Sequence, residues 1–151
     1  MFENILVCLD GSKIAEQILP YAKEQAKRFN SKLVLLRSYK MSTIEVAAAT
    51  QAASPSTLDL IEQDEHSLRN EAMTYLEEVA TPLREEGLKV DCVALNGVAG
   101  EVIVSYTHNE PINLIALATH GHSGLGRLVF GSVADYVLRK SGLPILLIKP
   151  K

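Results

Sequence analysis

The chain has 151 residues, of which 47% are hydrophobic and 22% are charged, and its formal net charge is −3. This length and composition indicate one folded domain and exclude a disordered chain. The negative charge argues against a broad electrostatic surface for nucleic acid, and no apolar run is long enough to cross a membrane.

The first part of the chain predicts a strand, a helix and a second strand. Its start lacks the basic residues and cleavage site of a secretory signal, so we expect a cytoplasmic protein. An apolar run over Asn4–Asp10 predicts a buried strand that ends in the turn Asp10-Gly11-Ser12. Apolar residues then recur at helical spacing from Ala15 to Phe29, where Pro20 favours a local kink. Lys32–Ser38 predicts the second strand.

The middle of the chain predicts a loop, a long helix and a third strand. Lys40–Thr57 is rich in Ala, Ser and Thr, which is typical of a flexible loop or of a short helix under a lid. A long helical pattern follows from Ile61 to Leu83. Pro82 is expected to tighten or break its last turn, and Gly87 to end it. Leu88–Leu95 predicts the third strand.

The last part of the chain predicts two helices and two strands. Apolar spacing predicts a short helix from Ala99 to Tyr106, and Ile112–Leu117 predicts the fourth strand. Ser132-Val-Ala-Asp135 has the pattern of a capping box, with Ser132 as the N-cap of a helix that stops at Gly142. Ile145–Ile148 predicts the fifth strand.

The segment Ala118–Ser132 is the strongest indication of function. It joins the fourth strand to a helix start, and four of the nine glycines fall between Gly121 and Gly131. Glycine lets the backbone approach a ligand closely, and the N–H groups at a helix N-terminus attract anions. The segment therefore predicts a site for phosphate or for a nucleotide.

The alternation of five strands with four helices predicts the α/β class, with an open parallel sheet and right-handed crossovers. In such sheets a ligand binds beyond the carboxyl ends of the strands, where the strand order reverses. If the first and fourth strands are neighbours there, Asp10 and the Ala118–Ser132 segment face the same crevice. An acidic acceptor would then lie beside a phosphate loop, as a ribose and its phosphates require.

Asp10 and two histidines each have a structural interpretation beside the functional one. Asp10 could simply cap the first helix, although Ser12 could fill that role and leave Asp10 for a ligand. His120 and His122 could contact phosphate or act as acid and base. No carboxylate is spaced to assist them, so loop structure or phosphate contact is the simpler interpretation of both.

The two cysteines, Cys8 and Cys92, each lie in an apolar strand-like run. This placement is typical of buried, reduced thiols. No Cys/His spacing indicates a metal site, and we expect His66 and His108 to be exposed helix residues.

Four segments, in a fixed order, carry a family resemblance. They are Ile5-Leu-Val-Cys-Leu-Asp-Gly-Ser12, Thr119-His-Gly-His-Ser-Gly124, Gly131-Ser-Val-Ala-Asp-Tyr-Val-Leu-Arg139 and Pro144-Ile-Leu-Leu-Ile148. Together they resemble the universal stress protein family over one domain spanning residues 1–151. The resemblance implies a Rossmann-like fold of the adenine nucleotide alpha hydrolase type. It also implies a sensor or regulator of the stress response rather than an enzyme.

The nucleotide-binding branch of that family carries a glycine, two residues, a second glycine, nine residues, and then Gly-Ser or Gly-Thr. Gly121 and Gly131-Ser132 match this pattern, whereas Ala118 stands where the first glycine is expected. The resemblance implies that ATP, with Mg²⁺, binds here. The methyl group of Ala118 leaves open a weakened or altered site.

The resemblance also assigns roles by position. Asp10 would accept hydrogen bonds from the ribose hydroxyls, while Cys8 and the backbone near Ser38 would border the adenine. The residues implied for the ribose and phosphates are Ala118, Thr119, His120, Gly121, His122, Ser123, Gly124, Gly131, Ser132, Val133 and Ala134. Arg127 either neutralises a phosphate or only keeps the loop soluble.

In the same family the fifth strand commonly pairs with its counterpart in a second chain. Ile145–Ile148 is an apolar edge candidate, so the resemblance implies a homodimer through it. Three alternatives stay open: an interaction module of this fold that has lost its nucleotide, a slow ATPase or phosphotransferase, and a site for cAMP or AMP.

Overall fold

A five-stranded parallel sheet organises the part of the chain that this computed structural model describes, residues 1–41, 55–119 and 131–151. The strand order is β3-β2-β1-β4-β5. The strands are β1 (Asn4–Cys8), β2 (Lys32–Tyr39), β3 (Lys89–Asn96), β4 (Leu114–Ala118) and β5 (Ile145–Ile148). The predicted α/β class with an open parallel sheet is confirmed.

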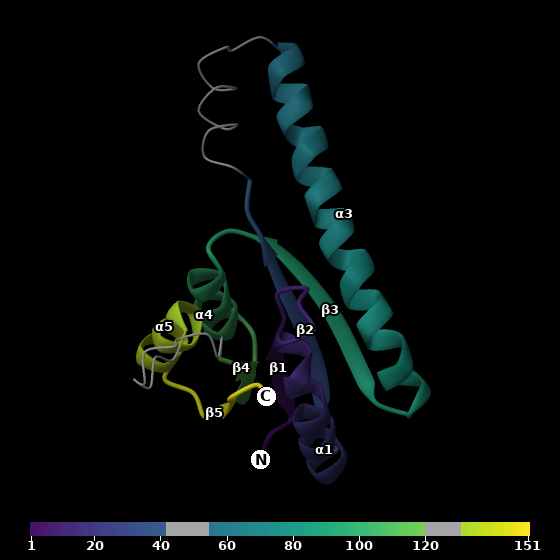
Figure 1. Cartoon of the computed structure of the whole chain (residues 1–151), viewed down its shortest axis with the longest axis vertical. Helices are drawn as coiled ribbons and strands as arrows, with labels where there is room; N and C mark the ends of the chain where they lie inside the picture. Colours follow the sequence, from purple (N-terminus) through teal and green to yellow (C-terminus); the bar gives the residue numbers. More distant parts are fainter. Residues whose placement is uncertain (42–54, 120–130) are drawn as a thin grey trace.

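Helices cover both faces of this sheet (Figure 1). The helical elements of the described residues are the 3₁₀-helix η1 (Ala15–Ile18) and the α-helices α1 (Leu19–Phe29), α3 (Pro55–Glu85), α4 (Ala99–Asn109) and α5 (Ser132–Lys140). Helices α1 and α3 pack on one face, and α4 and α5 pack on the other. Among the described helices, none combines the length and apolarity that crossing a bilayer requires.

The central strand β1 separates two apolar cores, because successive side chains of a strand point to opposite faces. Ile5 and Val7 belong to the core beneath α1 and α3, whereas Leu6 and Cys8 belong to the core beneath α4 and α5. All four residues are buried. Burial on both faces explains why the strand reads as a continuous apolar run instead of an alternating one.

The strand order reverses between β1 and β4. These two strands pair in parallel, with Ile5 opposite Leu114 and Val7 opposite Ala116. Each has its next connection on the opposite side of the sheet, so a crevice forms at their carboxyl ends. The sequence argument for a crevice required the first and fourth strands to be neighbours, and in the structure they are.

The helical pattern that starts at Ala15 consists of two elements. One 3₁₀ turn, η1, leads directly into α1, and Pro20 lies in the first turn of α1. A proline there removes no helical hydrogen bond, because the first N–H groups of a helix have no partner within it. Pro20 therefore lies in the first turn of α1, next to the change from the 3₁₀ turn to the α-helix, and not in the interior of one continuous α-helix.

Helix α3 begins earlier than the sequence predicts. Its first residue is Pro55, inside the segment expected to be a loop, and proline is favoured at the first helical position. Residues 42–54 of that segment lie outside the described residues. The helix continues through Pro82 to Glu85. Gly87 then adopts a φ of +88° and donates to the Arg84 carbonyl at 2.9 Å, so the predicted tightening and end are confirmed.

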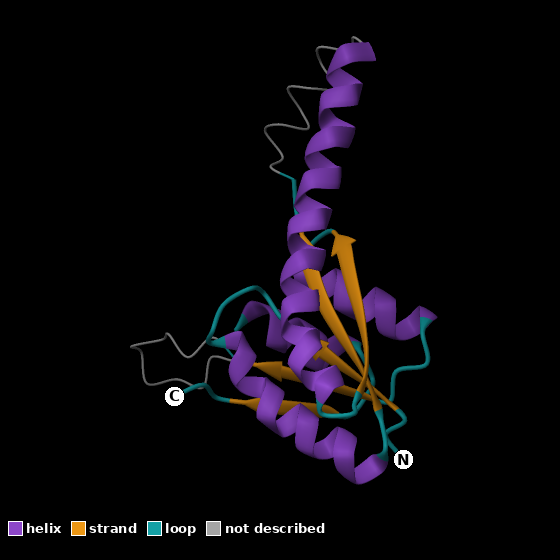
Figure 2. Ribbon diagram, turned by 90° about the vertical axis from the view of Figure 1, so that its right-hand side faces the viewer, coloured by secondary structure: helices purple, strands orange, loops and turns teal. Residues whose placement is uncertain are grey.

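The two halves of α3 differ in packing (Figure 2). The C-terminal half lies on the sheet and buries Ala72, Leu76 and Ala80. The N-terminal half extends beyond the sheet, where Leu58 and Leu60 are 53% and 61% exposed. The attachment of α3 to the domain therefore depends on its second half.

We expect Leu76→Ala to lower the free energy of unfolding by about 2–5 kcal/mol, because it leaves a cavity at a fully buried position. Leu60→Ala makes the same truncation at an exposed position of the same helix, and should change stability by no more than about 0.5 kcal/mol. Urea denaturation followed by far-UV circular dichroism measures both. Equal losses in the two variants would contradict the packing of α3.

Candidate functional site

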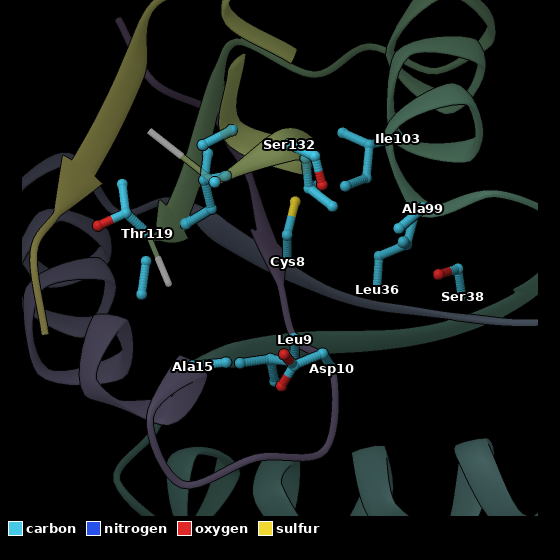
Figure 3. A pocket seen from close by; sticks show the side chains of 15 residues that line it. Cys8, Leu9, Asp10, Ala15, Leu36, Ser38, Ala99, Ile103, Thr119 and Ser132 are labelled. Atoms are coloured by element: carbon cyan, nitrogen blue, oxygen red, sulfur yellow. The ribbon is translucent and has the colours of Figure 1, made fainter. Parts of the chain in front are cut away.

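A cavity of about 200 Å³ lies where the carboxyl ends of β1, β2 and β4 meet the first residues of α4 and α5. Figure 3 shows it from close by. Of the predicted site residues, those that line the cavity are Cys8, Asp10, Ser38, Ala118, Thr119, Gly131, Ser132, Val133 and Ala134. Three separate stretches of the sequence, about residues 8, 38 and 118–134, thus contribute to one cavity.

Part of the predicted site cannot be placed. His120, Gly121, His122, Ser123 and Gly124 lie outside the described residues, as does Arg127. The two ends of the Ala118–Ser132 segment, by contrast, both line the cavity. His66 and His108 are exposed on α3 and α4, as expected.

The turn after β1 gives Asp10 and Ser12 different roles. The Ser12 hydroxyl oxygen accepts a hydrogen bond from the Ala15 N–H at 3.1 Å, so Ser12 caps η1. An Asp10 carboxylate oxygen accepts one from the Ser12 N–H at 2.8 Å and closes the turn. Asp10 is exposed and borders the cavity. Of the two candidates that the sequence offered for capping, Ser12 and not Asp10 accepts from the first N–H of η1.

Cys8 forms part of the apolar wall and not a reactive centre. Its side chain points into the cavity (Figure 3) and is buried. Burial raises the pKa of the Cys8 thiol to about 12, so the thiol is neutral at physiological pH. Cys92, on the edge strand β3, is only half-buried, which corrects the expectation that both cysteines are buried. Burial, with the charge of Glu77 as a smaller cause, raises the pKa of Cys92 to about 11.

The start of α5 corrects the predicted capping box. The N-cap is Gly131, and its carbonyl accepts from the Asp135 N–H at 3.0 Å. Ser132 is therefore the first residue of the helix and not its cap. The Asp135 carboxylate instead accepts from Arg139 Nε at 3.0 Å, one turn further along the helix. An acidic residue near a helix start is favoured by the helix dipole alone, which is why the sequence resembles a capping box.

This one-residue shift places the start of α5 directly at the cavity. Ser132, Val133 and Ala134 all line it. Their N–H groups belong to the first turn, where a helix has no carbonyl to offer as a partner. Such a turn carries a partial positive charge that favours a phosphate or carboxylate.

The end of β4 is joined to β5 by Thr119. Its side chain is buried, and its N–H donates to the Ile148 carbonyl at 2.9 Å. The Thr119 hydroxyl donates to the same carbonyl at 3.4 Å. The first residue after β4 is therefore anchored to the edge strand, while Ala118 beside it borders the cavity.

The remaining wall of the cavity is apolar, and it was not part of the sequence prediction. It consists of Leu9, Ala15, Leu36, Ala99, Ile103 and Leu117. Leu9, Ala15, Ala99 and Leu117 lie at a strand end or a helix start, which was the signal for them, whereas Leu36 and Ile103 lie inside β2 and α4. Which of these elements converge depends on the strand order. The described lining of the cavity thus combines an apolar wall, one carboxylate and a helix N-terminus.

The chain matches the model of the universal stress protein family over residues 1–149. Universal stress protein MJ0577 of Methanocaldococcus jannaschii is 27% identical over 157 aligned residues, covering 100% of this chain and 97% of that protein. The solved structure of MJ0577 superimposes with a TM-score of 0.81 at 26% identity, covering 100% of this chain and 98% of that one.

Two further solved structures share the fold. A universal stress protein in complex with cAMP superimposes with a TM-score of 0.68 at 17% identity, covering 99% and 98% of the two chains. A family member from Arabidopsis thaliana with AMP bound gives 0.66 at 18% identity, covering 98% and 92%. The family match spans nearly the whole chain, and the strand order and cavity accompany it. The chain therefore belongs to the universal stress protein family.

Proposed function

We propose that this protein binds an adenine nucleotide, ATP with Mg²⁺, in the cavity and acts as a regulator that responds to it. The observation that carries the proposal is the convergence of Asp10, an apolar recess and the N-terminus of α5 on one cavity. A nucleotide has three parts with matching chemistry: ribose hydroxyls, an aromatic base and anionic phosphates.

Each part of the nucleotide has a place in the proposal. The base lies against Cys8, Leu36 and Ile103, whose side chains face the cavity (Figure 3). Asp10 accepts hydrogen bonds from the ribose hydroxyls. The phosphates lie at the first turn of α5, whose N–H groups donate to them.

Two relatives solved with nucleotides support an adenine ligand, because one holds cAMP and the other AMP. Each of these ligands carries a single phosphate, cyclic in cAMP and free in AMP, so they support the base and ribose more strongly than the triphosphate. Within the described residues, no group of three or more His, Cys, Asp or Glu side chains is placed to hold a metal ion. In the proposal, Mg²⁺ is therefore held chiefly by the phosphates of ATP.

We expect Gly131→Val to weaken ATP binding at least tenfold, because a branched side chain at the N-cap of α5 would fill phosphate space. Ala118→Gly should bind ATP equally or more tightly, since it restores the close backbone approach of the family pattern. Ser105→Val is the control, because Ser105 is exposed on α4 and does not line the cavity. Isothermal titration calorimetry with ATP and Mg²⁺ measures all three.

Mass spectrometry of small molecules released from the purified, denatured protein complements the titrations. If neither a released nucleotide nor a thermal shift with ATP and Mg²⁺ is found, the binding proposal fails and the interaction module is favoured. Preferential binding of cAMP or AMP would correct the ligand but keep the site. Weaker binding by Ala118→Gly would contradict the interpretation of that position.

We also propose that the cavity binds ATP without turning it over. Among the described cavity residues Asp10 is the one that carries a charged side chain, and a single carboxylate engaged with a ribose does not orient an attacking water. We expect phosphate release from ATP to stay at the buffer background. Release by the wild type that is lost in a variant with His120→Ala and His122→Ala would instead show slow hydrolysis.

The edge strand β5 supports a further part of the proposal, a homodimer. Its sequence is Ile145-Leu-Leu-Ile148, and all four side chains are half-buried within one chain. The opposite edge, β3, carries Lys89 and Asp91, and charges on an edge strand discourage pairing. An apolar strand at the edge of the described sheet favours a second copy of β5 as its neighbour.

The backbone of β5 shows which groups are available for that pairing. The carbonyl of Pro144, just before β5, accepts from Ile115 of β4 at 3.0 Å, and the carbonyl of Ile148 accepts from Thr119, just after β4, at 2.9 Å. Backbone groups of alternate residues point to opposite sides of a strand. The N–H of Leu147 therefore points away from β4, towards the open edge.

We expect Leu147→Pro to convert a wild-type dimer to a monomer, because proline removes an outward N–H while the edge position tolerates it within the fold. Leu147→Ala is the matched control: it loses the same side chain but keeps the N–H, and should remain dimeric. Sedimentation velocity distinguishes the two states. A monomeric wild type, or a dimeric Leu147→Pro, would overturn pairing through β5.

A further inference from the structure

Arg37 lies directly beneath the turn that holds Asp10, on the opposite face of the sheet from the cavity. Its neighbours in β2, Leu36 and Ser38, line the cavity. Because the side chains of a strand alternate, Arg37 points to the face covered by α3 and η1. Its guanidinium reaches Gly11 so closely that a Cβ atom built there would lie 3.0 Å from Arg37 Cζ.

The guanidinium is stacked between the Gly11 backbone and an aromatic ring. Arg37 Cζ lies 5.0 Å from the centroid of the Tyr75 ring, which is the geometry of a cation–π contact. Gly11 has a φ of +89°, so the turn requires glycine both for its backbone conformation and for the approach of Arg37. The Arg37 guanidinium occupies the space that a side chain at position 11 would need.

Tyr75 is itself held in place by η1, the 3₁₀-helix that follows the Asp10-Gly11-Ser12 turn. Its hydroxyl donates to a Glu16 carboxylate oxygen at 3.1 Å, and Glu16 also binds Lys13 Nζ at 2.9 Å. Burial, reinforced by Glu16, raises the pKa of Tyr75 well above its usual value, so the hydroxyl keeps the proton that it donates. These contacts link Arg37 of β2 to Tyr75 of α3, and Tyr75 to Glu16 of η1. They support the turn on the side away from the cavity.

Arg37 and Asp10, two charged residues at this turn, have opposite signs. The charges of Arg37 and Asp10 both act on Tyr75, with opposite effects on its pKa. Arg37 lies against Gly11, and so it contacts the short turn on which the exposed Asp10 carboxylate stands. A carboxylate that must meet two hydroxyls benefits from such a fixed support, because an ordered acceptor loses less entropy when the ligand binds.

We propose that Arg37, stacked between Gly11 and Tyr75, is a positioning residue that fixes the Asp10 carboxylate for ribose and so sets a preference for ribonucleotides over 2′-deoxyribonucleotides. This inference rests on the nucleotide function proposed above. Arg37 acts from the far side of the turn and does not touch the ligand. Its effect is accordingly confined to the part of the ligand that Asp10 binds.

The test compares ATP with 2′-deoxy-ATP, each with Mg²⁺, by isothermal titration calorimetry. A hydrogen bond to a charged group contributes about 1.5–3 kcal/mol, so the wild type should prefer ATP by roughly tenfold or more. Arg37→Met keeps the length of the side chain and its packing on Tyr75. We expect it to weaken ATP more than 2′-deoxy-ATP, which offers Asp10 only its 3′-hydroxyl, and so to lose most of the preference for ATP. Arg37→Lys should restore part of it.

Asp10→Asn separates positioning from direct contact. The preference should be lost in Asp10→Asn alone, and adding Arg37→Met should cause no further loss if Arg37 acts through Asp10. If Arg37→Met weakens both nucleotides equally, or leaves the preference unchanged, the inference is overturned. A further loss in the double variant would also overturn it, because Arg37 would then act independently of Asp10.

A measurement without ligand distinguishes failure of this inference from failure of the nucleotide proposal. Hydrogen exchange of the Ser12 amide reports on its bond to Asp10, and we expect it to be about tenfold faster in Arg37→Met. The Leu9 amide, which donates to the Leu36 carbonyl at 2.9 Å, should not change. If the wild type binds neither nucleotide, the nucleotide proposal fails while the exchange still decides whether Arg37 fixes Asp10. Unchanged exchange at Ser12 would overturn the positioning role.

Discussion

The parallel pairing of β1 with β4 is the constraint on which the rest of the structure depends. It brings the end of the first strand beside the end of a strand more than a hundred residues later, with Ile5 opposite Leu114. Asp10 and the start of α5 can border one cavity only because of this pairing. The hydrophobic effect favours this central position, since Ile5 to Cys8 of β1 are buried on both faces of the sheet.

Alternate side chains of β2 point to opposite faces of the sheet, and the two faces have different roles. Leu36 and Ser38 border the cavity, whereas Arg37 between them faces α3. The same eight-residue strand thus contributes to the wall of the cavity and to the support of the turn beside it. A residue that contacts no ligand can in this way still influence what the cavity binds.

Local patterns predicted the elements well, because strand and helix periodicities are properties of short stretches. The apolar run at Ile145–Ile148 and the helix end at Gly87 both correspond to the structure. The errors lie where two local signals compete. Pro20 indicated a kink because the 3₁₀ turn before it has the same apolar spacing as an α-helix. Ser132 resembled an N-cap because Asp135 favours the first turn in either register.

The candidate site was predictable where it follows strand ends and a helix start, as at Asp10 and Ser132. Its apolar wall was not, because Ala99 and Ile103 are far in sequence from the other lining residues. The contact of Arg37 with Tyr75 is also invisible in the sequence, since it joins residues from two different elements through space. Long-range placement of this kind follows from strand order, and no short stretch of the sequence contains it.

The bond between Thr119 and Ile148 has a consequence for regulation. It joins Thr119, the second residue of the Ala118–Ser132 segment, to Ile148, the last residue of β5. If the cavity binds a nucleotide and β5 binds a second chain, both events act on the two ends of this hydrogen bond, and their free energies are linked through it. Such linkage is reciprocal: whatever factor the nucleotide adds to assembly, assembly adds to the affinity for the nucleotide. Concentration of the protein itself would then tune its response to ATP.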